Sequence, residues 1–288
     1  MNTITAIIRS LRPKQWIKNS LVFVALIFAA KFTDIRSVSL AISTFFLFSF
    51  AASSVYLLND IFDYEVDRNH PTKKNRPIAA GELNRIIAAI ISLLLGIGVL
   101  STSLIVNPLL TIILTIYFIN NLLYSFKLKH VAIVDILMVA FGFVLRAVGG
   151  AVAIGVSMSP WFLVIIFLLM LFLAIMKRRQ EFVVVNKNGG KRRKVLDSYS
   201  IDMLDQMGNI IIPTVLVSYV FYTFNTFHTQ YFIFTIPLVI YGIFRYLYLV
   251  HKKDLGESPT DTFVKDLPLF LTVVLWGVIC MVLIYYYE

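Results

Sequence analysis

The sequence predicts an all-α, polytopic membrane protein. Of its 288 residues, 59% are hydrophobic and only 15% are charged, and the mean hydropathy is +0.82. Soluble domains of this length are much more polar. The apolar residues gather in nine runs, each close to the ~20 residues that a helix needs to cross a bilayer. We therefore expect nine transmembrane helices and, because they fill most of the chain, a single domain covering residues 1–288.

The nine runs follow an amphipathic segment at the N-terminus. Residues 1–19 carry basic side chains and Trp16, a pattern typical of a segment that lies at the membrane interface. Residues 186–194 are rich in Gly, Asn and basic residues and predict a flexible loop. The membrane spans are expected at about residues 17–31, 38–58, 86–106, 109–126, 131–154, 160–178, 208–227, 231–250 and 267–287.

The Lys and Arg residues predict the orientation of these helices. With the N-terminus inside, 22 of the 26 basic residues fall on the inner side, two fall on the outer side and two lie within spans. Cytoplasmic loops carry such an excess. We therefore expect a multi-pass protein of a bacterial inner membrane, with the N-terminus and the active-site loops in the cytoplasm. The net charge of +10 then reflects topology and contact with anionic membrane lipids, and it does not indicate a nucleic-acid partner.

An acidic motif directly follows the second apolar run. Asp60, Asp63 and Asp67 are spaced by three and four residues, so on one continuous helix their carboxylates share a face, which Asn59 borders. Mg²⁺ is usually bound by one or two carboxylates together with substrate phosphates. The motif therefore predicts a catalytic Mg²⁺ site, and the alternative is a solvated acidic helix end. The basic residues that can bind the phosphates follow at once: Arg68, Lys73, Lys74 and Arg76.

A second polar site closes the fourth span. Lys127 and Lys129 follow Tyr124 and can bind a phosphate, and Asp135 lies one turn inside the next span. Two lysines in this place also fit simple charge anchoring at the cytoplasmic face. An acidic residue within a span is costly, so Asp135 points more strongly to a role in binding.

Arg146 lies deep in the fifth expected span. It comes eleven residues after Asp135, so the two side chains share a helical face about 16 Å apart. An arginine inside the membrane indicates a functional site, and the alternative is a structural ion pair or a clamp on backbone carbonyls between helices. The following Gly149 and Gly150 allow another helix to approach closely.

A basic triplet, Lys177-Arg178-Arg179, closes the sixth span. Its ammonium and guanidinium groups can bind a substrate phosphate, although ordinary charge at the end of a span has the same appearance. Lys177 and Glu181 share a helical face at i and i+4 and can hold each other in place. Arg178 is therefore the expected phosphate contact.

In this setting the acidic motif resembles that of the UbiA superfamily of intramembrane prenyltransferases. Asn59-Asp60-x-x-Asp63-x-x-x-Asp67 follows the second span, and Tyr124-Ser125-x-x-Leu128-Lys129 resembles the tyrosine–lysine motif that ends the fourth span in this family. The resemblance covers nearly the whole chain. It implies a bundle of nine transmembrane helices around a central cavity open to the cytoplasmic side, with Mg²⁺ and a diphosphate held at its mouth.

Further segments are similar to one branch of this superfamily, the decaprenyl-phosphate phosphoribosyltransferases. Aromatic prenyltransferases carry a second aspartate-rich motif after the sixth span, where this chain has its basic triplet. The branch implies transfer of 5-phosphoribose from phosphoribosyl pyrophosphate to a polyprenyl (decaprenyl-type) phosphate, with release of pyrophosphate, for cell-envelope polysaccharide synthesis. The similar segments are 11–19, 142–146 and 241–248.

The resemblance also implies roles for individual residues. Asp60, Asp63 and Asp67 would be the catalytic residues and the Mg²⁺ ligands. The residues that would bind the two phosphate substrates are Asn59, Lys14, Lys73, Arg76, Tyr124, Lys127, Lys129, Asp135, Arg146, Lys177 and Arg178.

The sequence leaves two other functions open. An aromatic prenyltransferase of quinone or haem biosynthesis would need a pocket for an aromatic acid, in which Arg146 could bind the carboxylate. A secondary transporter is the alternative that is not an enzyme, but such transporters often contain internal repeats, and we find none in the sequence. A homo-oligomer also stays open.

Overall fold

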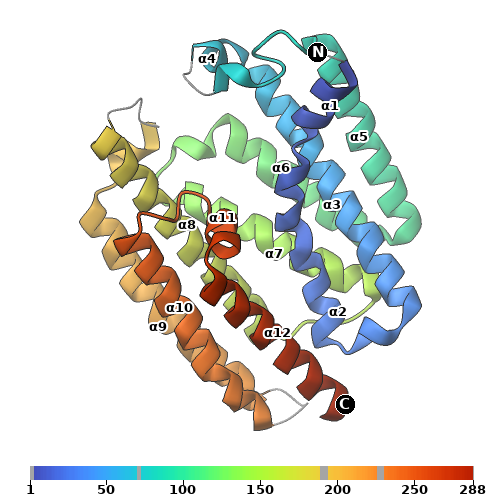
Figure 1. The fold of residues 1–288 in the computed structure, drawn as a ribbon. Coiled ribbons are helices and arrows are strands. Elements are labelled where there is room, and N and C mark those ends of the chain that lie inside the picture. The colour runs from blue at the N-terminus through green and yellow to red at the C-terminus, as the bar shows by residue number, and fades with distance from the viewer. Residues whose placement is uncertain (1–2, 70–72, 189–193, 226–229, 288) are drawn as a thin grey trace. The chain divides into compact units, whose positions relative to one another are not determined.

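The computed structural model of the protein describes residues 3–69, 73–188, 194–225 and 230–287. Every regular element in these residues is a helix (Figure 1), and eight of the helices are long and apolar enough to cross a membrane. The predicted all-α class is therefore confirmed. The chain groups into two compact units, which we describe separately; the single domain expected from the sequence stays a prediction.

The N-terminal unit consists of Met1–Leu26, Phe32–Phe126 and Leu145–Ser157. Helix α3 is its central element, and α1, η1, α5 and α6 all pack against it (Figure 1). Up to residue 126 the chain forms the α-helices α1 (Thr3–Leu11), α2 (Val24–Phe28), α3 (Ile35–Phe62), α4 (Tyr64–Arg68), α5 (Arg85–Val106) and α6 (Pro108–Phe126), and the 3-10 helices η1 (Pro13–Phe23), η2 (Lys31–Thr33) and η3 (Lys73–Asn75).

The first expected span, residues 17–31, differs from the prediction. It is not one regular α-helix but the 3-10 helix η1 followed by the five-residue helix α2. Trp16 Nε1 donates a hydrogen bond to Ser53 Oγ and Asn19 Nδ2 donates one to Ser49 Oγ, so polar side chains hold this segment along α3. Eight candidate spans are therefore found in the described residues, where we had expected nine.

The close approach predicted at the glycine pair is confirmed. A Cβ atom built on Gly150 would collide with the backbone carbonyl oxygen of Val22, and one on Gly149 would collide with the ring of Phe48. Because glycine has no side chain, this part of α7 (Val134–Ile154) can lie directly against η1 and α3.

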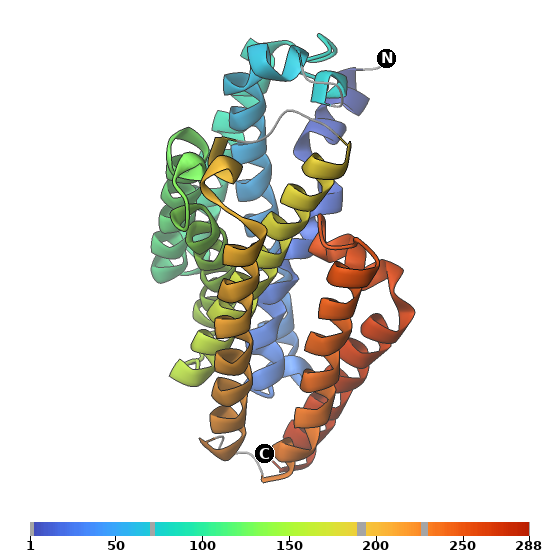
Figure 2. The ribbon, with the colours of Figure 1, turned by 90° about the vertical axis from the view of Figure 1, so that its left-hand side faces the viewer.

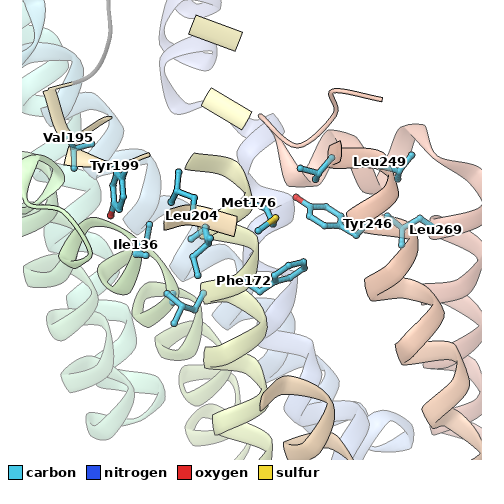
Figure 3. Close-up of a cluster of buried hydrophobic side chains, with 14 residues drawn as sticks. Ile136, Phe172, Met176, Val195, Tyr199, Leu204, Tyr246, Leu249 and Leu269 are labelled. Atoms are coloured by element: carbon cyan, nitrogen blue, oxygen red, sulfur yellow. The ribbon is translucent and has the colours of Figure 1, made fainter. Parts of the chain in front are cut away.

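The C-terminal unit consists of Ile27–Lys31, Lys127–Val144 and Met158–Glu288. Helix α8 packs against α9, and α10 packs against α12 (Figures 1 and 2). Figure 3 shows the main buried cluster, in which Phe172 and Met176 of α8 lie between Tyr199 and Tyr246. The elements are η4 (Leu128–His130), the first part of α7, α8 (Pro160–Asn188), η5 (Lys194–Ser198), α9 (Ile201–Asn225), η6 (Gln230–Thr235), α10 (Ile236–Lys252), α11 (Pro259–Lys265) and α12 (Leu267–Tyr287).

The boundaries around the basic triplet also differ. The sixth span was expected to end at residue 178, but α8 continues to Asn188, so the triplet lies within a helix and not at its end. Of the expected loop 186–194, residues 186–188 are helical and residues 189–193 lie outside the described residues. Helix α9 begins at Ile201, about two turns before the expected start at residue 208.

Candidate active site

The acidic motif lies where α3 ends. The helix stops at Phe62, Asp63 has φ −84° and ψ 5°, and α4 begins at the next residue. The backbone N–H of Asp63 still donates to the carbonyl of Asn59, and that of Asp67 donates to the carbonyl of Asp63. The chain therefore turns at Asp63, and the single helical face expected for all three carboxylates is interrupted.

Two of the three carboxylates are brought together through arginine. Arg76 Nη1 donates to Asp60 Oδ1 at 2.9 Å and to Asp67 Oδ2 at 2.6 Å. Arg12 Nη2 donates to the same Asp60 Oδ1 at 2.5 Å. Asp60 and Asp67 are almost fully buried, with 2% and 1% of their surfaces exposed, whereas Asp63 is only partly buried. We call Arg12, Asp60, Asp67 and Arg76 the acidic-motif cluster.

The carboxylate oxygens of the cluster decide whether it fits Mg²⁺. Asp67 Oδ1 is buried and accepts no hydrogen bond from the residues that the structure describes, and Lys73 Nζ lies 3.9 Å from it. Two buried carboxylates, one of them with a free acceptor oxygen, fit an ion that takes one or two carboxylates and completes its shell with water and phosphate. The expected three-carboxylate group does not form, because no three His, Cys, Asp or Glu side chains in the described part of the chain gather closely enough.

The other residues expected at this site have different degrees of exposure. Lys14 is exposed on η1, and Lys73 is partly buried on η3 beside Asp67. Asn59 is partly buried, and its backbone carbonyl accepts the Asp63 N–H. Lys14 and Lys73 can therefore reach a ligand at the surface of the N-terminal unit, while Asn59 contributes to the turn at the end of α3.

A second ionic network is buried in the C-terminal unit around Asp135. Arg178 Nε donates to Asp135 Oδ2 at 2.6 Å, and Arg178 Nη1 donates to Glu181 Oε2 at 2.5 Å. The Tyr199 hydroxyl donates to Asp135 Oδ1 at 2.7 Å and accepts the backbone N–H of Ile133. Burial, together with the hydrogen bond to Asp135, raises the pKa of Tyr199, so the phenol stays protonated and donates. We call Asp135, Arg178, Glu181 and Tyr199 the Asp135 network.

This network changes the interpretation of the basic triplet. Arg178, the expected phosphate contact, is only 3% exposed and lies between two carboxylates. Arg179 forms a bidentate pair with Asp205 of α9. Lys177 has a side chain that is 40% exposed, with its Nζ 3.9 Å from Glu181 Oε1. The geometry therefore disfavours Arg178 as a direct ligand and makes Lys177 the most accessible cation of the three.

Arg146 forms a third buried group, in the N-terminal unit. Its Nε donates to Asn19 Oδ1 at 2.6 Å and its Nη2 donates to the Tyr117 hydroxyl at 2.8 Å. The guanidinium also lies 4.8 Å from the centroid of the Tyr117 ring. Arg146 thus ties α7 to η1 and α6 through side-chain hydrogen bonds, and its expected part in substrate binding stays a prediction. Its predicted shared face with Asp135 does not make them partners, since Asp135 pairs with Arg178.

The residues of the tyrosine–lysine motif are divided between the two units along the chain. Tyr124 is partly buried near the end of α6. Lys127 is exposed and Lys129 is partly buried around η4, in the C-terminal unit. Their expected phosphate contacts stay a prediction.

Sequence reasoning missed two residues of these clusters, Arg12 and Tyr199. Arg12 is 48 positions from Asp60, and Tyr199 is 64 positions from Asp135, so helical spacing cannot connect either pair. The signal that was available for Arg12 is its place in the 11–19 segment, directly before a proline. No comparable signal marks Tyr199.

Comparison with known proteins agrees with this architecture. The model of the UbiA prenyltransferase family matches residues 20–272. A decaprenyl-phosphate phosphoribosyltransferase from Corynebacterium glutamicum is 36% identical over 99% of this chain and 88% of its own. One from Mycobacterium tuberculosis is 34% identical over 96% and 93%. A structure of a UbiA homolog from Archaeoglobus fulgidus bound to GPP and Mg²⁺ has a TM-score of 0.73 at 18% identity, over 97% of this chain and 99% of its own. The chain belongs to the UbiA prenyltransferase family and is a membrane transferase.

Proposed function

We propose that this protein transfers 5-phosphoribose from phosphoribosyl pyrophosphate to a polyprenyl phosphate and releases pyrophosphate. The observation that carries the proposal is the 34–36% identity, along nearly the whole chain, to decaprenyl-phosphate phosphoribosyltransferases. The basic triplet of α8 supports it, because these cations replace the second aspartate-rich motif expected of an aromatic prenyltransferase. The product would feed the synthesis of cell-envelope polysaccharides.

The acidic-motif cluster is the proposed site for the donor diphosphate. Asp60 and Asp67 would hold Mg²⁺, with Asp63 at its edge. When bound, Mg²⁺ stabilises the negative charge that develops on the leaving pyrophosphate. Lys73, Arg76 and the exposed Lys14 can donate hydrogen bonds to phosphate oxygens, each worth about 1.5–3 kcal/mol when the groups are charged.

The proposed reaction needs no general base. A phosphate oxygen of the lipid, already ionised at neutral pH, attacks C1 of the ribose. The bond from C1 to the pyrophosphate oxygen breaks, and pyrophosphate leaves with the electron pair. The protein therefore has to place two phosphate-bearing substrates, and Lys177, Lys127 and Lys129 are candidates for contacts with them.

The proposed location is the bacterial inner membrane, with the N-terminus and the acidic motif facing the cytoplasm. The excess of basic residues on one side of the spans supports this orientation. A water-soluble donor such as phosphoribosyl pyrophosphate could then reach the acidic-motif cluster from the cytoplasm, and the lipid phosphate could reach it from the inner leaflet.

The test is an assay of the purified full-length protein with Mg²⁺ and two alternative substrate pairs. One pair is labelled phosphoribosyl pyrophosphate with decaprenyl phosphate, and the other is a prenyl diphosphate with 4-hydroxybenzoate. We expect label to enter the lipid fraction only with the first pair. Prenylation of the aromatic acid without phosphoribosyl transfer would show that the proposed donor and acceptor are wrong.

A further inference from the structure

The acidic-motif cluster contains an unusual pairing of charges. Two guanidinium groups, from Arg12 and Arg76, donate to the same oxygen of one buried carboxylate, Asp60 Oδ1. Arg76 also binds the second buried carboxylate, Asp67. These two negative and two positive groups carry no net charge together, and Lys73 adds a further positive group 3.9 Å from Asp67, so the protein already neutralises the carboxylates that would hold a metal ion.

Arg12 reaches this position with a strained backbone. Its φ of 54° and ψ of 56° place it in the left-handed helical region, which costs an ordinary residue roughly 1–2 kcal/mol, and proline follows it. The guanidinium lies 4.9 Å from the centroid of the Tyr56 ring as well as against Asp60. The contacts made by the side chain therefore offset a cost at the backbone, which indicates that this arginine is placed for its charge.

The arginines leave part of the acidic pair unused. Asp67 Oδ1 is buried but accepts no hydrogen bond from the described part of the chain, and Lys73 Nζ lies 3.9 Å from it. The side chains of Arg12 and Arg76 are 28% and 27% exposed, whereas those of Asp60 and Asp67 are nearly inaccessible. The carboxylates are thus fixed inside the protein, and the partly exposed arginines are the members of the cluster that can change partner.

We propose that Arg12 and Arg76 are exchangeable counter-ions that make metal binding depend on the diphosphate. This inference rests on the proposed function only in that the substrate carries a metal-bound diphosphate. If a divalent ion bound alone, it would add two positive charges to a neutral cluster. These charges would lie beside the guanidinium groups that the ion displaces. A diphosphate arriving with the ion supplies the negative charge to which both arginines can move.

The proposal assigns a new role to Arg12, as a residue that acts before and during substrate binding. With the diphosphate absent, it competes with the metal for Asp60. With the diphosphate present, it contributes a contact to a phosphate oxygen. The two ligands must then strengthen each other's binding by the same factor, and couplings of this kind usually lie in the range of about 5- to 150-fold.

The experiment measures Mn²⁺ binding to the detergent-solubilised full-length protein by electron paramagnetic resonance, with and without inorganic pyrophosphate. For the wild type we expect the Mn²⁺ affinity of the protein site to rise at least tenfold when pyrophosphate is present. Arg12→Gln should bind Mn²⁺ alone about tenfold more tightly and lose most of the enhancement by pyrophosphate. Arg12→Lys, which keeps the charge, should retain the enhancement.

Arg36→Gln is the matched control, because it removes one positive charge from an exposed position at the opposite end of α3. Equal Mn²⁺ affinity with and without pyrophosphate in the wild type would overturn the proposal, and this measurement needs no variant to fold. The proposal would also be overturned if Arg12→Gln weakened the binding of Mn²⁺ and of pyrophosphate equally, because structural damage has that effect. Both candidate donors, phosphoribosyl pyrophosphate and a prenyl diphosphate, carry a diphosphate group, so pyrophosphate is a probe for either. Intact coupling without phosphoribosyl transfer would therefore refute the proposed function alone, and transfer without coupling would refute only this inference.

Discussion

The Asp135 network predicts that Arg178 stabilises the fold more than it binds substrate. Arg178→Ala removes the guanidinium that lies 2.6 Å from Asp135 Oδ2 and 2.5 Å from Glu181 Oε2. Asp135 has no exposed surface, so it would stay buried with the Tyr199 hydroxyl but without its cation. Removing one partner of such a buried pair typically costs about 3–5 kcal/mol, and we expect a loss of unfolding free energy of this size.

The assay is equilibrium unfolding of the purified variants in detergent, combined with a double-mutant cycle. Arg178→Ala together with Asp135→Asn should cost less than the sum of the two single changes, by about 0.5–3 kcal/mol, because the double variant leaves no unpaired charge at Asp135. The neighbouring Arg179→Ala is the matched control. The side chains of Arg179 and its partner Asp205 are 13% and 32% exposed, so solvent screens this pair more than the Arg178–Asp135 pair, and its loss should cost less, about 1 kcal/mol.

A specific result would refute this reasoning. If Arg178→Ala unfolds like the wild type while the KM for either phosphate substrate rises tenfold or more, then Arg178 is the phosphate contact that the sequence suggested. The ion pairs of the Asp135 network would then exist only in the substrate-free protein and would break when substrate binds.

Three further predictions test the metal site, the topology and the packing. Asp60→Asn should abolish transfer while the protein stays folded, chelation with EDTA should stop the wild type, and activity that survives in EDTA would contradict the metal site. A cysteine at Asn75 should react with an impermeant thiol reagent only in inverted vesicles and one at Ser157 only in intact cells; the reverse pattern would invert the orientation. Gly150→Ala should destabilise the protein by about 1–3 kcal/mol, because its methyl group would meet the Val22 carbonyl, whereas Gly98→Ala, with open space around it, should be neutral or stabilising in the same unfolding assay.

The helices were largely predictable because hydrophobic length is a local property of the chain. Eight of the nine expected spans correspond to helices in the structure. The exception, residues 17–31, is apolar enough to be predicted as a span. Hydropathy carries no information on the hydrogen bonds by which Trp16 and Asn19 bind α3. The sequence also predicts the end of α8 too early, because charged residues commonly follow a membrane span, whereas this helix continues through them to Asn188.

The candidate site was predictable only in part, because spacing along a helix gives the face of a side chain and not its neighbour. The motif spacing correctly singled out Asp60 and Asp67, but the turn at Asp63 separates that residue from the pair. Asp135 and Arg146 are predicted to act on one helical face, yet Asp135 pairs with Arg178 of α8 and Arg146 binds Asn19 of η1. Such contacts, like the one between Arg12 and Asp60, join residues far apart in the chain, and only the folded arrangement reveals them.

The Asp135 network also has a consequence for protein engineering. It fixes the chain before and after residues 189–193, which belong to the flexible loop that the sequence predicts, through Arg178 in α8 and through Tyr199. Since the free energy of closing a loop grows only slowly with its length, extra residues inserted between these two anchors should disturb the fold little. This connection is therefore a suitable place to insert a small, rigid reporter domain. Such a fusion would provide a fluorescent handle, or a fiducial mark for electron microscopy.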